Sequence, residues 1–406
     1  MKYIVIIADG LADEGQTELN GRTPLAYAKT EMLDILAKKS EIGLVQTIPK
    51  GMEAGSDIAG LTILGYDAKT QYCGRGSLEL LGLNLGQSFS SFTEKDIVYR
   101  MNLVTIQENK KIPTFENSIL LDHTAGQIST EEAKEILKNL QKLFDRMEFK
   151  YYTETSYRHL LIGNSKKIES LTPPHNILGQ QIKDYLPQDK MLYNLMKESY
   201  HQLRNCKINQ WRIDNKKMPA NSIWLWGGGS QYHLENFKKK YNKKSAMVSA
   251  VAVLKGIAHG CGMVNLTVQG ATGTVKTNYE EKAKRAITAL LEESYDFVCV
   301  HIEAPDEASH RGCLQDKIYA IEQIDRHIVK TIVETLEIKK EDFRLLFLPD
   351  HYTLVQERVH TSKPVPYLLY DSKSFVQNNF AYNEKQTQFM PLLSDGTKLI
   401  QKLFSE

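Results

Sequence analysis

Three short apolar runs in this sequence each lead into an aspartate. The runs are YIVIIA (3–8), FVCVHI (297–302) and LLFL (345–348), and they are followed by Asp9, Asp306 and Asp350. Such runs, almost wholly apolar and without polar alternation, are typical of strands buried on both faces of a parallel sheet. Ligands of open α/β sheets bind at the carboxyl ends of the strands, so these aspartates mark a candidate site.

Helical spacing follows the strand-like runs. In residues 23–40 the apolar side chains fall near one face, and in residues 315–336 a stripe of isoleucines does the same. Strands that alternate with helices predict an α/β fold, with a mainly parallel sheet flanked by helices.

The middle of the chain has a different character. From about residue 90 to 215 it is more polar, less regular and locally rich in lysine. We therefore expect a discontinuous core of residues 1–85 and 216–406, with a smaller α+β domain inserted at 90–215 that binds substrate. The apolar run NSIWLWGGGS (221–230) is expected to return the chain to the core.

Composition narrows the function classes. The formal net charge is +2, with 42% hydrophobic and 25% charged residues, which gives no bias toward nucleic acid or membrane partners. Five cysteines without a CxxC pair are typical of reduced thiols in a cytosolic protein. No apolar run is long enough to span a bilayer, so we expect a cytoplasmic protein.

Histidines accompany two of the three aspartates. His310 lies four residues after Asp306, His351 follows Asp350 directly, and His360 comes nine residues later. Three carboxylates and three imidazoles at one sheet edge would suit two divalent metals. The alternative is structural: Asp306 caps a helix and His310 is a bystander, as an isolated pair of this kind usually is.

A nucleophile is also available. Ser56 follows Gly55 in a turn of small residues before an apolar helix, in GMEAGSDIAGLTILGYD (51–67). A metal lowers the pKa of a bound hydroxyl and so activates it. Without metal ligands nearby, Ser56 and Asp57 would be ordinary N-cap residues.

Taken together, these stretches resemble a known family. The chain is similar to the cofactor-independent (2,3-bisphosphoglycerate-independent) phosphoglycerate mutases of the archaeal type, within the alkaline phosphatase superfamily. The resemblance runs from the N-terminus to past residue 360, over ADGLAD, GSDIAGLTILGYD, GRGSLELLG, NLVT, DHTAGQIST, YRHLL, PPHNILG, NSIWLWG, GATGTVKTNYEEKA, HIEAPDEASHRG, KIYAIEQID, LPDH and HTSKPVP.

The resemblance implies an alkaline-phosphatase-like core and a mechanism. Ser56 would take the phosphoryl group of 3-phosphoglycerate and return it to give 2-phosphoglycerate, a reaction of glycolysis and gluconeogenesis that needs no 2,3-bisphosphoglycerate. Two divalent metals are implied, manganese first, with zinc, cobalt or magnesium as alternatives. One would be held by Asp9, Ser56, Asp350 and His351, and the other by Asp306, His310 and His360.

Further residues are expected to bind the substrate or act in catalysis. The resemblance implies His123 and Arg158 in the inserted domain, with Arg75 and Lys255 as further candidates. An Arg grips a carboxylate or phosphate in bidentate fashion. Lys255 could equally be exposed for solubility, and His123 could be a packed residue beside Asp122.

Three positions depart from the family pattern. Gln127 stands where the family usually has Arg, Gly60 where it often has Asn, and Met101 where it has Cys. The loss of an Arg bears on substrate choice. Two other functions therefore stay open: a metal-dependent phosphomonoesterase or phosphotransferase acting on another small phosphorylated metabolite, and a non-catalytic protein that binds a phosphorylated metabolite.

Overall fold

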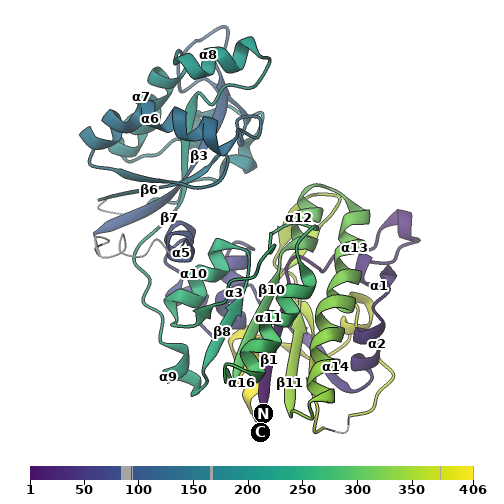
Figure 1. Ribbon diagram of the computed structural model, residues 1–406. Helices are drawn as coiled ribbons and strands as arrows, with labels where there is room; N and C mark the ends of the chain where they lie inside the picture. Colours follow the sequence, from purple (N-terminus) through teal and green to yellow (C-terminus); the bar gives the residue numbers. More distant parts are fainter. Residues whose placement is uncertain (84–92, 94, 165–167, 375, 406) are drawn as a thin grey trace. The chain divides into compact units, whose positions relative to one another are not determined.

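The computed structural model describes residues 1–83, 93, 95–164, 168–374 and 376–405. The chain divides into two compact units (Figure 1). Unit 1 comprises residues 1–72, 81–83 and 233–406, and unit 2 comprises residues 73–80 and 84–232.

Within the described residues, unit 1 is built on an eight-stranded sheet in the order β15-β2-β14-β11-β1-β10-β8-β9. The strands from β11 through β1, β10 and β8 to β9 are parallel to one another, whereas β14 runs antiparallel to both of its neighbours, β11 and β2. The strands are β1 (Lys2–Ala8), β2 (Ser40–Val45), β8 (Ser245–Val248), β9 (Val264–Asn265), β10 (Phe297–Ile302), β11 (Phe343–Leu348), β14 (Val365–Asp371) and β15 (Leu392–Leu393). A two-stranded ribbon adds β12 (Tyr352–Leu354) and β13 (Val359–Thr361).

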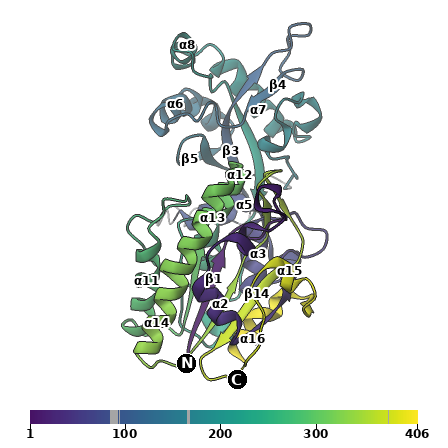
Figure 2. The same ribbon diagram turned by 90° about the vertical axis from the view of Figure 1, so that its right-hand side faces the viewer.

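Helices cover both faces of this sheet, which explains why its central strands are apolar throughout. One face packs against α2, α11 and the run from α13 to α14, and α3, α10 and α16 lie on the other (Figures 1 and 2). A π-helix at Ile324–Val329 joins α13 to α14. The α-helices that belong wholly to unit 1 are α1 (Pro24–Tyr27), α2 (Glu31–Ala37), α3 (Ser56–Ile63), α4 (Ala68–Gln71), α9 (Phe237–Tyr241), α10 (Ala252–Gly260), α11 (Tyr279–Leu291), α12 (Ala304–His310), α13 (Leu314–Gln323), α14 (Lys330–Ile338), α15 (Glu384–Thr387) and α16 (Leu399–Phe404).

Three neighbouring strands end at one edge of the sheet. Strand β1 lies between β10 and β11, and its register pairs Ala8 with Ile302 and Ile7 with Leu348. The three strands are parallel, so the residues that follow them emerge side by side. This register brings together segments that are about 300 residues apart in the sequence.

Unit 2 holds a separate antiparallel sheet. Its strand order is β4-β3-β6-β5. Outside this order, β7 pairs with the long strand β3 along much of the same stretch that β6 pairs with. The strands are β3 (Asp96–Gln107), β4 (Ile119–Asp122), β5 (Lys150–Thr153), β6 (Arg158–Asn164) and β7 (Ser222–Gly229). The helices are α6 (Thr130–Arg146), α7 (Lys190–Leu203) and α8 (Lys207–Asp214), and the unit boundary falls within α5 (Arg75–Gly82).

The predicted α/β class is confirmed: a core with a mostly parallel sheet flanked by helices carries an inserted unit that combines helices with an antiparallel sheet. The boundaries of the units differ from those expected. Strand β7 was expected in the core, but it pairs antiparallel with β3 over Ser222–Val104 to Gly229–Val98 and so belongs to unit 2. An apolar strand carries no signal for which of two sheets it will join.

Candidate functional site

The first group of site residues gathers beyond the end of β1. Asp9 is 1% exposed, and the backbone N–H of Gly10 donates to Asp350 Oδ1 at 3.0 Å. Gly10 has φ +60, and a Cβ there would come within 2.5 Å of Thr353 Oγ1 and 2.7 Å of Asp306 Oδ1. Glycine is therefore required here, because it lets the turn after β1 pass against the other strand ends.

Ser56 faces this group from the start of α3. Its hydroxyl donates to Asp9 Oδ2 at 3.2 Å, and Oγ lies 3.4 Å from His351 Nε2. The N-cap of α3 is Gly55, and Ser56 is the first helical residue. Ser56 is thus not an ordinary capping serine, since its side chain points at the acidic cluster rather than at the helix backbone.

The second group centres on Asp306. His360 Nε2 lies 3.1 Å from Asp306 Oδ1, and His310 Nε2 lies 3.4 Å from Asp306 Oδ2. The structural alternative for Asp306 does not hold, because the N-cap of α12 is Glu303 and Asp306 lies inside the first turn. The i, i+4 spacing of Asp306 and His310 places both side chains on one face of this helix.

The hydrogen bonds of the two imidazoles demand a positive charge between them. His310 Nδ1 lies 3.1 Å from the carbonyl oxygen of Arg358, and His360 Nδ1 lies 3.1 Å from that of Ala54. A carbonyl only accepts, so each Nδ1 carries a hydrogen and each Nε2 of a neutral ring presents a lone pair. These two Nε2 atoms are 2.7 Å apart and face the Asp306 carboxylate. Only a shared proton or a metal ion relieves that repulsion.

The acidic residues of the site also need a compensating positive charge. Burial, followed by the neighbouring carboxylates of Asp350, Asp306 and Glu303, raises the pKa of Asp9 well above its ordinary value. Among the described residues, Asp9 Oδ1 and Asp350 Oδ2 are buried and have no hydrogen-bond partner. Carboxylate oxygens left in this way are costly to bury, and a divalent cation would satisfy both. The donor set therefore fits metal ions.

In the part of the chain that the structure describes, three overlapping sets of side chains could each hold an ion. In each set the ligand atoms lie within 4.8 Å of one another. The sets are Asp306, His351 and His360; Asp9, His301 and Asp350; and Asp9, Glu303 and Asp306. Asp9 and Asp350 share one set and Asp306 and His360 share another, but His351 is grouped with Asp306 and His360 rather than with Asp9 and Asp350. Ser56 and His310 are in none of these sets, and His301 and Glu303 belong to them without having been predicted.

His301 is buried at the end of β10. Its Nε2 lies 3.0 Å from Asp9 Oδ2 and its Nδ1 lies 3.2 Å from Ser249 Oγ. Burial lowers the pKa of His301 to about 4, so the ring is neutral near pH 7. Its contact with Asp9 orients that carboxylate, as hydrogen-bond partners of metal ligands do. The available signal was its place in the run FVCVHI, as a polar residue in a strand with no polar alternation.

Unit 2 carries a separate cluster of charged residues. Arg75 Nε donates to Glu79 Oε1 at 3.2 Å, and Arg100 Nε donates to Glu79 Oε2 at 2.8 Å. Burial, with the nearby Glu79 carboxylate, raises the pKa of Glu154 to about 7, although Arg100 and Arg158 oppose this. Arg100 was not predicted from the sequence, because it lies inside the apolar strand β3, where it is 7% exposed.

Rings line the neighbouring part of unit 2. His123 packs edge-on against Tyr157 at 5.9 Å and against His175 at 6.0 Å, and the Arg100 guanidinium lies 4.2 Å from the Trp226 ring centre. Burial lowers the pKa of His123, so a neutral ring is favoured. The side chain of Asp122 accepts from the N–H and hydroxyl of Thr124, which is a turn contact.

Several known proteins are similar to this chain. A family model described as 2,3-bisphosphoglycerate-independent phosphoglycerate mutase matches residues 37–209. A probable 2,3-bisphosphoglycerate-independent phosphoglycerate mutase of Geobacter sulfurreducens is 38% identical over 411 residues, covering 99% of each chain. A 2,3-bisphosphoglycerate-independent phosphoglycerate mutase from Methanosarcina barkeri is 41% identical and covers 91% of this chain and 90% of its own.

This chain belongs to the 2,3-bisphosphoglycerate-independent phosphoglycerate mutases of the archaeal type. It is accordingly an isomerase. A structure from Pyrococcus horikoshii superposes with a TM-score of 0.79 at 27% identity, covering 100% of this chain and 98% of that one. The cofactor-independent phosphoglycerate mutase of Thermoplasma acidophilum superposes with a TM-score of 0.60 at 23% identity over 99% of each chain, which shows the shared fold.

The three positions that depart from the mutase pattern, Gly60, Met101 and Gln127, lie in different local surroundings. A Cβ on Gly60 would approach Leu254 Cδ1 to 2.9 Å and Ile257 Cδ1 to 3.0 Å, so glycine lets α10 pack closely on α3. Met101 is fully buried in the core of unit 2. Gln127 has φ +51 and its N–H donates to Thr124 Oγ1 at 3.0 Å, so it lies in a tight turn.

Lys255 is in unit 1, whereas Arg75, His123 and Arg158 are in unit 2. It lies on α10 of unit 1 with a half-buried side chain. Burial lowers the pKa of Lys282 to about 8, and the positive charge of Lys255 contributes in the same direction. Lys255 is therefore near another ammonium group and is not a freely solvated surface lysine.

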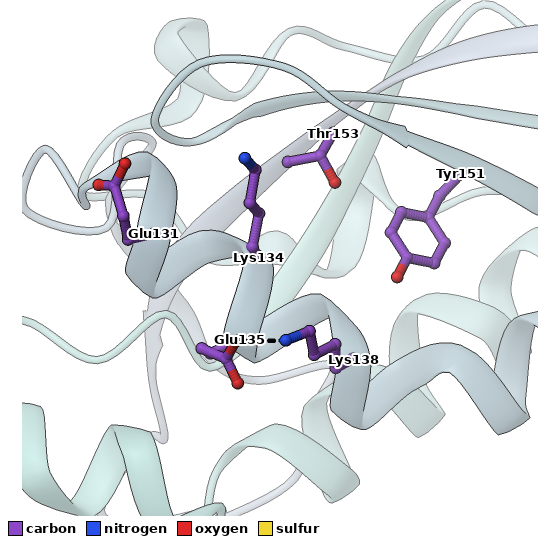
Figure 3. A pocket seen from close by; sticks show the side chains of 6 residues that line it. All are labelled: Glu131, Lys134, Glu135, Lys138, Tyr151 and Thr153. Carbon is purple, nitrogen blue, oxygen red and sulfur yellow. Dashed lines mark hydrogen bonds and ion pairs between the residues drawn. The ribbon is translucent and has the colours of Figure 1, made fainter.

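A shallow hollow of about 380 Å³ lies on unit 2, between α6 and β5 (Figure 3). Its rim carries two acidic and two basic side chains, and Glu135 pairs with Lys138 across one turn of the helix. None of the predicted site residues lines it. Its charges balance and are solvated, so the hollow is a weaker candidate for a functional site than the acidic cluster of unit 1.

Among the described residues, no helix is both long enough and apolar enough to cross a membrane.

Proposed function

We propose that this isomerase interconverts 3-phosphoglycerate and 2-phosphoglycerate through a phosphoserine on Ser56, without 2,3-bisphosphoglycerate. The observation that carries the proposal is the position of Ser56 Oγ, 3.2 Å from Asp9 Oδ2 and 3.4 Å from His351 Nε2. The relatives from Geobacter and Methanosarcina bear the same activity in their names. The reaction belongs to glycolysis and gluconeogenesis.

The proposal includes two divalent cations. We assign Asp9, Ser56, Asp350 and His351 to one ion and Asp306, His310 and His360 to the other. In support, His351 Nε2 lies 3.3 Å from Asp350 Oδ2, and His360 Nε2 lies 3.1 Å from Asp306 Oδ1. When bound, such ions lower the pKa of a ligating hydroxyl and neutralise charge on the transferred phosphoryl group. Mixed carboxylate and imidazole ligands suit manganese first, then zinc, cobalt or magnesium.

The first transfer begins at Ser56. Its Oγ–H donates toward Asp9 Oδ2, which leaves the lone pairs of Oγ directed away from that carboxylate. Ser56 Oγ attacks phosphorus, the bond from phosphorus to the C3 oxygen breaks, and the proton of Ser56 is matched by one taken up at that oxygen. Glycerate and phosphoserine are the products, so no phosphoryl group is lost.

The second transfer reverses the first at a different oxygen. The C2 hydroxyl of the same glycerate attacks the phosphoserine, the bond between phosphorus and Ser56 Oγ breaks, and Oγ regains a proton. The isomerisation balances only if glycerate stays bound and water is kept from the phosphoserine. Water acting as the acceptor would give a phosphatase instead.

We assign the anionic parts of the substrate to Arg75, His123 and Arg158 of unit 2 and to Lys255 of unit 1. The side chain of Arg158 is exposed, and that of Arg75 is 31% exposed while it pairs with Glu79. Guanidinium groups held in this way suit carboxylate and phosphate oxygens. His123 is half-buried and can donate or accept a hydrogen bond as a neutral ring.

A coupled assay tests the proposal. Purified protein receives 3-phosphoglycerate and manganese, without 2,3-bisphosphoglycerate, and enolase reports 2-phosphoglycerate while released phosphate is followed in parallel. We expect isomerisation that chelator abolishes and that Ser56→Ala reduces by about 10⁴-fold or more. Ser405→Ala, at the exposed C-terminal end of the chain, is the matched control and keeps full activity.

Other outcomes would point elsewhere. Free phosphate without isomerisation would replace the mutase with a phosphomonoesterase on the same nucleophile. Metal binding with neither reaction would refute phosphoglycerate as the substrate and direct attention to Gln127, where an expected Arg is absent. Full activity in Ser56→Ala would refute the phosphoserine step.

A further inference from the structure

Thr353 lies between the two groups of candidate metal ligands without belonging to either. It is on β12 and is fully buried. Its Oγ1 lies 2.7 Å from Asp306 Oδ1, a residue of the second group, and 3.2 Å from His351 Nδ1, a residue of the first. One hydroxyl therefore touches one ligand of each proposed ion.

The direction of these hydrogen bonds follows from the single hydrogen of a hydroxyl. A carboxylate accepts hydrogen bonds, and Asp306 Oδ1 lies 2.7 Å from Thr353 Oγ1. Thr353 must then donate to Asp306. It has no second hydrogen for His351, so His351 Nδ1 must carry a hydrogen and donate to Thr353.

This assignment decides which nitrogen of His351 can bind a metal. With the hydrogen on Nδ1, the lone pair of the neutral ring is on Nε2. That atom lies 3.3 Å from Asp350 Oδ2, 3.4 Å from Ser56 Oγ and 3.6 Å from Asp9 Oδ1. The free nitrogen thus faces the oxygens that would share its ion, as a metal-binding histidine requires.

The hydroxyl is held in place by its own backbone. Thr353 N–H donates to the carbonyl oxygen of Ala12 at 3.1 Å, and Lys317 Nζ donates to the carbonyl oxygen of Thr353 at 2.7 Å. In the β12–β13 ribbon, Thr353 is paired directly with His360. Gly10 approaches from the other side, where any side chain would collide with Oγ1. The hydroxyl has little freedom to turn away.

We propose that Thr353 is a positioning residue that couples the two cation groups, because its one hydroxyl hydrogen orients Asp306 and thereby fixes the Nδ1–H form of His351. The proposal rests on the proposed two-cation function of these ligands. The hydrogen-bond assignment itself applies to the metal-free protein and can be measured there.

Two variants separate the hydroxyl from the shape of the side chain. Thr353→Val has nearly the same shape and no hydroxyl, and Thr353→Ser keeps the hydroxyl. Nitrogen-15 NMR of histidine-labelled, metal-free protein at pH 8 reports the protonated nitrogen of His351, with the signal assigned by its loss in His351→Asn. Manganese titration of the same samples, followed by electron paramagnetic resonance, reports affinity, and thermal unfolding checks the fold.

We expect wild type and Thr353→Ser to show Nδ1–H on His351 and manganese affinities within about threefold of one another. Thr353→Val should lose the preference for Nδ1–H and bind manganese about 10–100-fold more weakly, the usual effect of removing a partner of a metal ligand. If Thr353→Val does not fold, Thr353→Ala, which leaves space rather than strain, takes its place.

A Thr353→Val protein with unchanged tautomer and affinity would overturn the proposal. So would a folded Thr353→Ser protein that binds as weakly as Thr353→Val, because shape and not the hydroxyl would then matter. The failure of the proposed function is a separate result: wild-type protein that binds manganese but does not isomerise phosphoglycerate would refute the mutase and leave the Thr353 result intact.

Discussion

Replacing Lys317 with methionine should strongly destabilise unit 1. The ammonium group of Lys317 is fully buried. It donates to Asp13 Oδ2 at 2.8 Å, to the carbonyl oxygen of Thr353 at 2.7 Å and to that of Ala12 at 3.4 Å. The substitution Lys317→Met keeps much of the volume and removes all three donors.

The size of the expected loss in unfolding free energy follows from the buried Asp13, which would lose its partner. Asp13 is 1% exposed on its side chain, so it would remain buried with its negative charge uncompensated. Breaking a buried ion pair from one side costs about 3–5 kcal/mol. Asp13 would keep hydrogen bonds from the N–H groups of Glu14 and Val355, which places the expected loss toward the lower end, at about 3 kcal/mol.

Urea unfolding of metal-free protein, followed by circular dichroism, measures this loss. All three tryptophans, Trp211, Trp224 and Trp226, lie in unit 2, so their fluorescence reports that unit alone. A change in circular dichroism without a matching change in fluorescence therefore belongs to unit 1. Chelator in every sample removes any contribution from ion binding.

Two further variants complete the test. Lys330→Met removes a 46% exposed lysine whose Nζ lies 3.9 Å from Glu334 Oε1, and it should cost less than about 0.5 kcal/mol. Adding Asp13→Asn to Lys317→Met removes the stranded charge and should recover about 1–2 kcal/mol. The reasoning is wrong if Lys317→Met costs no more than Lys330→Met, or if the double variant is less stable than the single one.

Three other outcomes are expected. Burial lowers the pKa of His159 to about 3, so as the pH falls below about 6.5 this histidine is protonated in the unfolded chain but not in the folded protein. This difference should lower the free energy of unfolding by about 2 kcal/mol between pH 7 and pH 5. Urea titrations of His159→Leu should lack this pH-dependent component. Arg212 is 1% exposed and donates to the carbonyl oxygens of Ala125 and Met218; Arg212→Met should cost about 3 kcal/mol in the fluorescence-detected unfolding of unit 2, and an unchanged midpoint would contradict this. Chelation should lower the melting temperature seen by circular dichroism, since Asp9 and Asp350 then face each other without a cation, and excess manganese should restore it.

The strand ends were predictable because their signal is local and strong. An apolar run followed by an acidic residue indicates both the strand and the point where it ends, so the sequence alone places Asp9, Asp306 and Asp350 at one edge of the sheet. The sequence left Asp306 and His310 between a metal site and a helix cap, and the structure shows that Asp306 is not the cap. Ser56 needed the metal ligands beside it before it could be distinguished from a cap.

The other residues could not be found by such reasoning. His301 and Arg100 lie inside apolar strands, where a single polar residue has no spacing to interpret. Their roles depend on tertiary partners, Ser249 and Glu79, that are 52 and 21 residues away in the sequence. Strand β7 was expected in the wrong sheet for a related reason, since its register with β3 is a long-range property.

The order of strands in unit 1 also bears on how the chain is made. Strand β1 is synthesised long before its two neighbours, β10 and β11, which begin at residues 297 and 343. Unit 2 closes its sheet much earlier, when β7 ends at residue 229. The apolar residues of β1 therefore remain unpaired through most of synthesis, when chaperones can bind them and they can aggregate. A chain arrested before residue 360 would carry the five described strands of unit 2 and lack His360, one of the proposed metal ligands.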